Sequence, residues 1–217
     1  NGLPGTNGTG THPNLAAIEA FYEPVVAAAL RRAQEIPEVL AEFDFDADGQ
    51  YFDGGNAKAE GTYTLESHGS GKALKLDGNG QYLAGTAKDG KSLLTDVDEM
   101  TVSYQIRPEN SKTNWGFFAA PNADTQKYQQ EHYLGIVDIN GTTSAERYNN
   151  SGARPATAKY ATGYNGWYYV TVVYTEGATT LYINGEKAAE EASAYALTEI
   201  LGDNSILYIG KSSWGQG

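Results

Sequence analysis

Three aspartates lie close together in a glycine-rich loop. Asp46, Asp48 and Asp53 fall within the stretch DADGQYFDGGN. Carboxylate oxygens on a bendable backbone are the ligands that Ca²⁺ prefers in proteins. The spacing is not that of an EF-hand, because no Glu stands at the twelfth position, and Asp and Gly also form turns without any metal. Two interpretations stay open: a calcium site with a structural role, and a metal-free turn.

Aromatic and planar polar residues are concentrated between residues 114 and 164. A sugar site needs an aromatic surface for the apolar face of the ring and planar polar groups for the hydroxyls. Trp115 and Tyr133 lie in predicted strands, where an aromatic side chain more often packs in a core. The preferred ligand-binding candidates are loop residues of this span together with a tryptophan near the end of the chain: Tyr128, Arg147, Tyr148, Asn149, Arg154 and Trp214.

Other catalytic chemistries find little support in the sequence. The three histidines, His12, His68 and His132, are far apart and lack metal-ligand spacing, so we expect them to be exposed loop residues. The chain contains no cysteine, which excludes disulfides, thiolate metal sites and cysteine nucleophiles. No Gly-x-Ser-x-Gly sequence supports a serine nucleophile, and no glycine-rich loop carries the lysine of a phosphate site.

Charge restricts the classes of partner. The formal net charge is −12, which repels nucleic-acid backbones and anionic lipid. No run of apolar residues approaches the roughly 18 to 20 that a membrane span needs. We therefore expect no nucleic-acid partner and no membrane insertion, and neutral ligands and cations remain as candidates.

The first 37 residues differ in pattern from the rest. Residues 1–13 are turn formers with almost nothing to bury, and predict a flexible linker. From Asn14, a candidate N-cap, apolar residues recur at three- and four-residue steps, which predicts a helical segment over 14–37 that Pro24 interrupts. Its apolar stripe must pack on the following domain or on a neighbouring one.

From residue 38 the period becomes strand-like. Apolar and polar residues alternate over 40–45, and further strands are predicted at 115–119, 133–139, 144–148, 167–174, 180–183, 186–189 and 206–209, with three short candidates between 62 and 86. Asn184-Gly185 separates two of them and is typical of a type I′ hairpin turn. Many short antiparallel strands with turns between them predict an all-β sandwich or jelly roll.

Several segments in fixed order carry a family resemblance: AEFDFDADG at 41–49, GKALKLDGNGQYLAG at 71–85, EMTVSYQIRP at 99–108, the hairpin at 166–187 and LYIGKSSW at 207–214. They resemble laminin-G-like domains of the concanavalin A-like lectin and glucanase superfamily. The resemblance implies a two-sheet antiparallel jelly roll over residues 38–217. Such domains continue into one more strand after the last of these segments, so the sandwich is expected to lack its last strand.

The resemblance also bears on catalysis. Catalytic members of the superfamily carry Glu-x-Asp-x-x-Glu along one strand, because retaining hydrolysis needs two carboxyl groups about 5 Å apart. The nearest match here has Ile136, Asp138 and Gly141 in those positions, so both glutamates are missing. We expect no catalytic residue in this domain, and Asp138 is interpreted as a residue that caps a turn.

The resulting hypothesis is a noncatalytic carbohydrate-binding or structural accessory module of a secreted or cell-surface bacterial glycan-degrading enzyme. Its expected partners are a neutral oligosaccharide or polysaccharide and an adjacent catalytic domain. Two alternatives stay open. The chain could be a fragment of a glycoside hydrolase whose catalytic domain lies outside it, or an adhesin module that binds a host surface protein.

Overall fold

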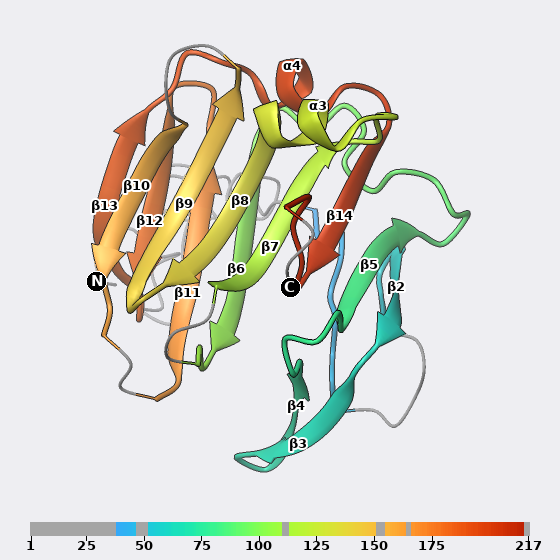
Figure 1. The fold of residues 1–217 in the computed structure, drawn as a ribbon, viewed down its shortest axis with the longest axis vertical. Helices are drawn as coiled ribbons and strands as arrows, with labels where there is room; N and C mark the ends of the chain where they lie inside the picture. The colour runs from blue at the N-terminus through green and yellow to red at the C-terminus, as the bar shows by residue number, and fades with distance from the viewer. Residues whose placement is uncertain (1–37, 47–51, 110–112, 151–154, 164–165, 215–217) are drawn as a thin grey trace, which may run out of the picture. The chain divides into compact units, whose positions relative to one another are not determined.

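The computed structural model describes residues 38–46, 52–109, 113–150, 155–163 and 166–214, without the side chains of 52–54. Within these ranges one large antiparallel sheet has eight strands (Figure 1). Across the sheet they are β1 (Phe52–Gly54), β2 (Ala57–Thr62), β5 (Tyr82–Ala87), β14 (Ser205–Ile209), β7 (Thr113–Pro121), β8 (His132–Ile139), β9 (Thr142–Asn149) and β10 (Ala156–Ala161).

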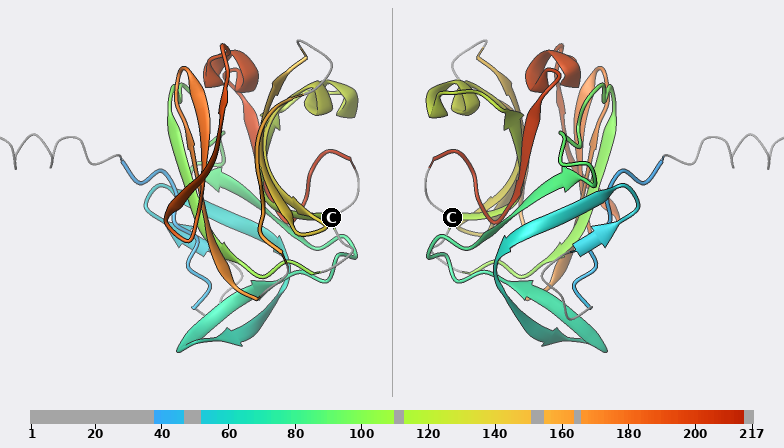
Figure 2. Two further views of the ribbon diagram at one scale, coloured as in Figure 1. Left: turned by 90° about the vertical axis from the view of Figure 1, so that its left-hand side faces the viewer. Right: turned by 90° about the vertical axis from the view of Figure 1, so that its right-hand side faces the viewer.

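A four-stranded sheet forms the second layer, as Figure 2 shows. Its order is β13 (Glu186–Ala192), β12 (Ala178–Ile183), β11 (Tyr168–Tyr174) and β6 (Met100–Ile106), and a separate hairpin joins β3 (Thr64–His68) to β4 (Gly71–Lys75). These elements belong to the unit that begins at Leu40. The predicted two-sheet, all-β antiparallel sandwich is confirmed.

The core between the sheets follows from residue alternation. In β11 every second side chain is buried, and Val170 and Val172 are 0% exposed. They pack in one cluster with Leu134 and Ile136 of β8, which are also fully buried. Because side chains of a strand alternate between its faces, the other residues of the same strands must lie on the outer faces of the sheets.

Strand prediction succeeded where alternation was strong. The Asn184-Gly185 turn has positive φ at both residues, 52° and 83°, as a type I′ turn requires. Two of the strands not predicted, β2 and β10, consist mainly of alanine, threonine, lysine and other small or polar residues. Two short helices were also missed: α3 (Gln126–Glu131), where the Thr125 side chain caps the N-terminus, and α4 (Leu197–Leu201).

The prediction of a strand at 40–45 is wrong, because within the described residues this segment has no ladder partner. The alternation itself is confirmed: Phe43 and Phe45 are half-buried, whereas Glu42 and Asp44 are exposed. The two phenylalanines pack against the cluster around Ala59 and Leu83. This packing accounts for the alternation of apolar and polar residues without sheet hydrogen bonds. The linker predicted at 1–13 and the helical segment at 14–37 lie outside the described residues.

Candidate functional site

Six aromatic side chains from neighbouring strands form what we call the outer aromatic face, on the side of the large sheet that points away from the second layer. Ring centroids are 5.4 Å apart for Tyr82 and Tyr208, 5.5 Å for Phe118 and Tyr133, and 6.0 Å for Tyr133 and Tyr148. The members, in the order of their strands, are Tyr82 (β5), Tyr208 (β14), Trp115 and Phe118 (β7), Tyr133 (β8) and Tyr148 (β9). Since strands lie about 4.8 Å apart, the band is roughly 19 Å wide.

The face exists because these residues alternate with core residues. Leu83, Leu134 and Leu207 point into the sandwich, so their neighbours Tyr82, Tyr133 and Tyr208 must point outward. Trp115, Phe118 and Tyr133 belong to a hydrophobic cluster separate from the inter-sheet core. The prediction that Trp115 and Tyr133 are packing residues is confirmed by their exposures of 9% and 4%.

The segment after β14 crosses this face and places Trp214 on it. The Gly210 amide donates to the Trp115 carbonyl (2.8 Å), and the side-chain amides of Gln126 and Gln130 of α3 both donate to the Ser213 carbonyl. The Trp214 ring is stacked on Trp115 with centroids 5.8 Å apart and planes 5° apart. Its other neighbours, Tyr133 and Phe118, contact it edge-on at 5.2 and 6.1 Å.

Trp214 is nevertheless 43% exposed. One side of the indole rests on Trp115, so the exposed part lies on the opposite side and along its edges. A planar aromatic surface fixed by rings beneath it is the kind of group on which the apolar face of a sugar can stack. Of the predicted ligand residues, the structure brings Trp214 and Tyr148 to this one face.

Two charged side chains border the aromatic rings. Glu146 accepts a hydrogen bond from the Tyr133 hydroxyl (2.7 Å), and burial, reinforced by this carboxylate, raises the pKa of Tyr133 well above its ordinary value. The Lys211 ammonium lies over the rings of Tyr82 (4.2 Å) and Tyr208 (4.9 Å), within cation–π distance. The face therefore offers a carboxylate acceptor and an ammonium donor beside its rings.

A second feature lies where β9 ends. A hollow of about 400 Å³ is lined by Arg147, Tyr148 and Asn149 together with residues 191–195, which end β13 and follow it. These three are the last residues of β9 and not loop residues, which confirms the strand predicted at 144–148, whereas Tyr128, also predicted in a loop, lies in α3. The strand continues to Asn149 because β8 supplies register partners as far as His132.

Arg147 is buried in the structure. It is 2% exposed, and its guanidinium donates to the carbonyls of Thr175 (2.7 Å) and Tyr195. Burial lowers the pKa of the Arg147 guanidinium. The Thr175 carbonyl follows directly after β11, and the Tyr195 carbonyl lies shortly before α4. The geometry thus gives Arg147 a structural contact between β9 and the other layer rather than an open surface for a ligand.

The remaining predicted ligand residues are not gathered at the outer aromatic face. Tyr128 is 45% exposed and stacks on His132 with centroids 4.0 Å apart, and no ring contact among the described residues links it to Trp214. Arg154 lies outside the described residues. Sequence reasoning missed Tyr82, Tyr208 and Lys211; the signal available was the alternation in QYLAG and LYIGK, where tyrosine and leucine must point to opposite faces.

In the acidic loop, Asp46 lies within the described residues, whereas Asp48 and the Asp53 side chain lie outside them. The Asp46 carboxylate accepts from the Lys72 amide (2.6 Å), and a Cβ at Gly71 would collide with it. Within the described residues, no three acidic or histidine side chains cluster as metal ligands would. The contacts of Asp46 therefore fasten residue 46 to the start of β4.

Asp138 does not cap a turn, as had been expected, but is buried between the layers at 2% exposure. One carboxylate oxygen, Oδ2, accepts from the hydroxyls of Tyr168 (3.1 Å), Thr143 (3.2 Å) and Thr162 (3.3 Å). The histidines also differ from expectation: His68 is a half-buried residue of β3 that hydrogen-bonds Gln105 (2.7 Å), and His132 begins β8. His12 lies outside the described residues.

No helix in the described part of the chain is long and apolar enough to cross a bilayer. Among solved structures, domain 4 of an extracellular GH43 arabinanase from Geobacillus stearothermophilus, solved with arabinotriose, is similar to this chain. The two are 18% identical, the match covers 82% of this chain and 85% of that one, and the TM-score is 0.56. The carbohydrate-binding module CBM66 from Bacillus subtilis matches at 12% identity over 71% of this chain and 88% of that one, with a TM-score of 0.40.

No curated protein gave a significant match. The likeness to the arabinanase domain supports the fold, whereas the TM-score of the CBM66 match is too low to carry an argument. A family model described as the concanavalin A-like lectin/glucanases superfamily matches residues 76–217, which is more than half of the chain. Together with the two-layer sandwich, this match shows that the chain belongs to the laminin-G-like branch of the concanavalin A-like lectin/glucanases superfamily.

Proposed function

We propose that this chain is a noncatalytic carbohydrate-binding module that holds an oligosaccharide against the outer aromatic face. The observation that carries the proposal is Trp214, an indole 43% exposed whose inner side is stacked on Trp115. Because the rings beneath it fix the indole, a sugar can stack on it without first having to order it. Tyr148, half-buried on the neighbouring part of the face, extends the surface.

The polar groups at the border suit a ligand with many hydroxyls. Glu146 can accept hydrogen bonds from a sugar and Lys211 can donate them, and both lie beside rings of the face. The net charge of −12 opposes strongly anionic polymers, so we propose a neutral glycan. The arabinanase domain of similar fold was solved with arabinotriose, which makes arabino-oligosaccharides the first probes.

The wider setting is part of the same proposal. In a module of this kind, the glycan-binding face would keep an adjacent catalytic domain of a secreted or cell-surface bacterial enzyme close to its polymer. Support for the noncatalytic role is the burial of Asp138, whose carboxylate binds three hydroxyls between the sheets. Hydrolysis of a glycan by the isolated chain would contradict this part of the proposal.

The test is calorimetric titration with neutral oligosaccharides, arabinotriose first. Replacing Trp214 by alanine should weaken binding at least about tenfold, because tenfold corresponds to about 1.4 kcal/mol, within the range of one aromatic contact. Tyr169→Ala is the matched control, since Tyr169 is 55% exposed and lies on β11 of the other sheet. Equal loss in both variants, or no saturable binding to any glycan by the unaltered chain, would overturn the proposal.

We also propose that the acidic loop binds a calcium ion with a structural role. Asp46 is the described member of the predicted set, and one of its oxygens already holds the Lys72 amide, so the second oxygen is the one that would face an ion. Thermal unfolding with calcium and with a chelator tests this. A rise in melting temperature with calcium that Asp48→Asn and Asp53→Asn remove is expected, and equal melting temperatures would refute it.

A further inference from the structure

A second hollow lies at the other end of β9 and β10 from Tyr148. Its volume is about 420 Å³, within the range of small-ligand sites. Tyr160 and Thr162 at the end of β10, Trp167 and Tyr168 at the start of β11, and Asn184 and Glu186 around the β12–β13 turn line it. We call it the turn hollow. Tyr160 pairs with Thr143 of β9, which lies five residues before Tyr148 on the same strand. At about 3.4 Å per residue, the turn hollow is therefore about 17 Å from the outer aromatic face along β9.

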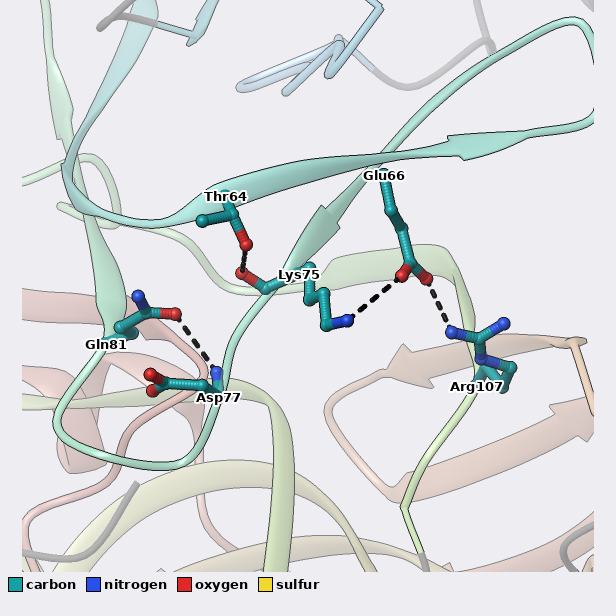
Figure 3. Close-up of polar contacts among 6 residues, drawn as sticks. All are labelled: Thr64, Glu66, Lys75, Asp77, Gln81 and Arg107. Carbon is teal, nitrogen blue, oxygen red and sulfur yellow. Dashed lines mark hydrogen bonds and ion pairs between the residues drawn. The ribbon is translucent and has the colours of Figure 1, made fainter.

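The aromatic wall of the turn hollow is held rigid from behind. Trp167 lies against His68 with ring centroids 4.0 Å apart, and the Arg107 guanidinium lies 5.3 Å from its centroid. Arg107 is bound to Glu66 of β3 (2.6 Å), which also pairs with Lys75 of β4 (3.6 Å), as Figure 3 shows. His68 of β3 and Arg107, which Glu66 of β3 holds, thus order the Trp167 ring, and this ring lines the hollow.

A second, more exposed ring also lines the hollow. Tyr160, on edge strand β10, is 45% exposed. A sugar ring that lies between two aromatic side chains buries its apolar faces on both.

Polar groups with unused bonding capacity stand at the turn. The Tyr169 amide donates to Oδ1 of Asn184 (3.0 Å), which holds the side chain in place, and this bond leaves both N–H donors of the side-chain amide. Glu186 is exposed and forms no ion pair within the described residues. Its neighbour Lys187 pairs with Glu190 instead (2.8 Å). An amide donor beside a carboxylate acceptor matches a pair of neighbouring sugar hydroxyls.

The floor of the hollow is also ordered. The hydroxyl oxygens of Thr162 and Tyr168 lie 3.3 and 3.1 Å from Oδ2 of the buried Asp138 carboxylate, and Thr162 lies equally close to the Gly141 carbonyl (3.3 Å). The Thr143 hydroxyl is within hydrogen-bond distance of both, so Asp138 and Thr143 together set their orientation. A hydroxyl oxygen has two lone pairs, so each can still accept one hydrogen bond from a ligand beside Thr143. This gives the carboxylate a positioning role beneath the hollow.

We infer that the turn hollow is a second glycan-binding site, which takes one neutral sugar unit between Tyr160 and Trp167 with its neighbouring hydroxyls on Asn184 and Glu186. The Glu186 carboxylate excludes uronic or sulfated sugars at this position by charge repulsion. The inference rests on the proposed function for its ligand class, but it uses none of the residues of the outer aromatic face. A module with two such sites would hold one polymer at two points and gain avidity for it.

Stoichiometry tests the inference. Calorimetric titration with arabinotriose, or with the neutral oligosaccharide that binds best in a panel, should give two sites per chain. Tyr160→Ala and Trp214→Ala should each leave one site, and the double variant none. Glu186→Gln keeps the shape of the side chain and should weaken the remaining site of the Trp214→Ala protein by about tenfold, as the loss of a charged hydrogen bond does. Tyr169→Ala is again the control.

Each outcome separates the two proposals. One outcome is a single site per chain that Trp214→Ala removes and that Tyr160→Ala and Glu186→Gln leave unchanged. This result would overturn the second site and keep the proposed function. One site that only Tyr160→Ala removes would support the turn hollow and overturn the outer aromatic face. No binding by the unaltered chain would overturn both. The exposed positions of Tyr160 and Glu186 mean that both variants should fold, which melting temperatures within about 2 °C of the unaltered chain would verify.

Discussion

Replacing Arg147 distinguishes a structural residue from a ligand contact. The guanidinium is 2% exposed and donates to the carbonyls of Thr175 and Tyr195. In Arg147→Met a side chain of similar length fills the same space, but the two partly buried carbonyls lose their donors. An unsatisfied buried acceptor costs about 1–3 kcal/mol, and relief from burying a charge offsets part of the sum, so we expect a loss of about 2–4 kcal/mol.

The loss is measurable in two ways. For a chain of this length about 1 kcal/mol shifts the melting temperature by roughly 2–4 °C, so Arg147→Met should melt roughly 5–15 °C lower. Urea unfolding should show the same loss with an unchanged slope. Arg147→Lys should lose less, because one ammonium can satisfy one carbonyl but lacks the planar fork that reaches both. Lys159→Met, a change at an exposed position of β10, is the control.

Glycan affinity decides the interpretation. At a temperature where the variant is folded, Arg147→Met should bind oligosaccharide within about threefold of the unaltered chain, a difference below 1 kcal/mol. An unchanged melting temperature together with lost binding would refute the structural assignment, and would show that Arg147 contacts the ligand.

Three further predictions follow from burial. Asp138→Ala removes the buried acceptor that the hydroxyls of Tyr168, Thr143 and Thr162 share, and only part of that loss can be made up by the contact between Tyr168 and Thr143 (3.0 Å). Urea unfolding should therefore show a loss of about 2–3 kcal/mol, and an unchanged free energy of unfolding would refute this reason. A Cβ at Gly116 would collide with the Tyr104 ring, so Gly116→Ala should destabilise by about 1–3 kcal/mol, and a crystal structure with an unmoved Tyr104 would contradict that reason. Burial raises the pKa of Tyr104, Tyr133 and Tyr174 above the ordinary 10.0, so these groups stabilise the fold fully below pH 10. Above pH 10 the unfolded chain releases their protons and the folded chain retains them, so the free energy of unfolding should fall by about 1.4 kcal/mol per pH unit for each tyrosine, and a flat profile from pH 10 to 11 would refute it.

Much of the fold could be predicted from local sequence. Alternation in the β11 segment indicates which of its residues face the core, because a strand has a period of two. Asn184-Gly185 indicates the hairpin turn, because few residue pairs tolerate positive φ twice. Strand β10 was missed because ATAKYA has weak strand propensity, and its pairing with β9 holds it in place.

The sites depend on contacts that local sequence does not encode. Alternation shows that Tyr82, Tyr148 and Tyr208 lie on the face of their strand opposite to that of the core residue next to them. It does not show which strands are neighbours in the sheet. The order β5-β14-β7-β8-β9 places residues more than 120 positions apart on one face, and only long-range pairing determines that order. Arg147 and Tyr148 are adjacent in sequence and both polar enough for a surface, yet the pleat sends one to the inter-sheet space and the other to the outer face.

The sequence by itself therefore determined the class of fold and the family, because these depend on residue type and on short periods along the chain. Tertiary structure alone decided which aromatic residues meet, that Trp214 lies on Trp115, and that Asp138 and Arg147 are buried. Those outcomes depend on strand order and on the distance between the two layers, and no local pattern in a single chain specifies either of them.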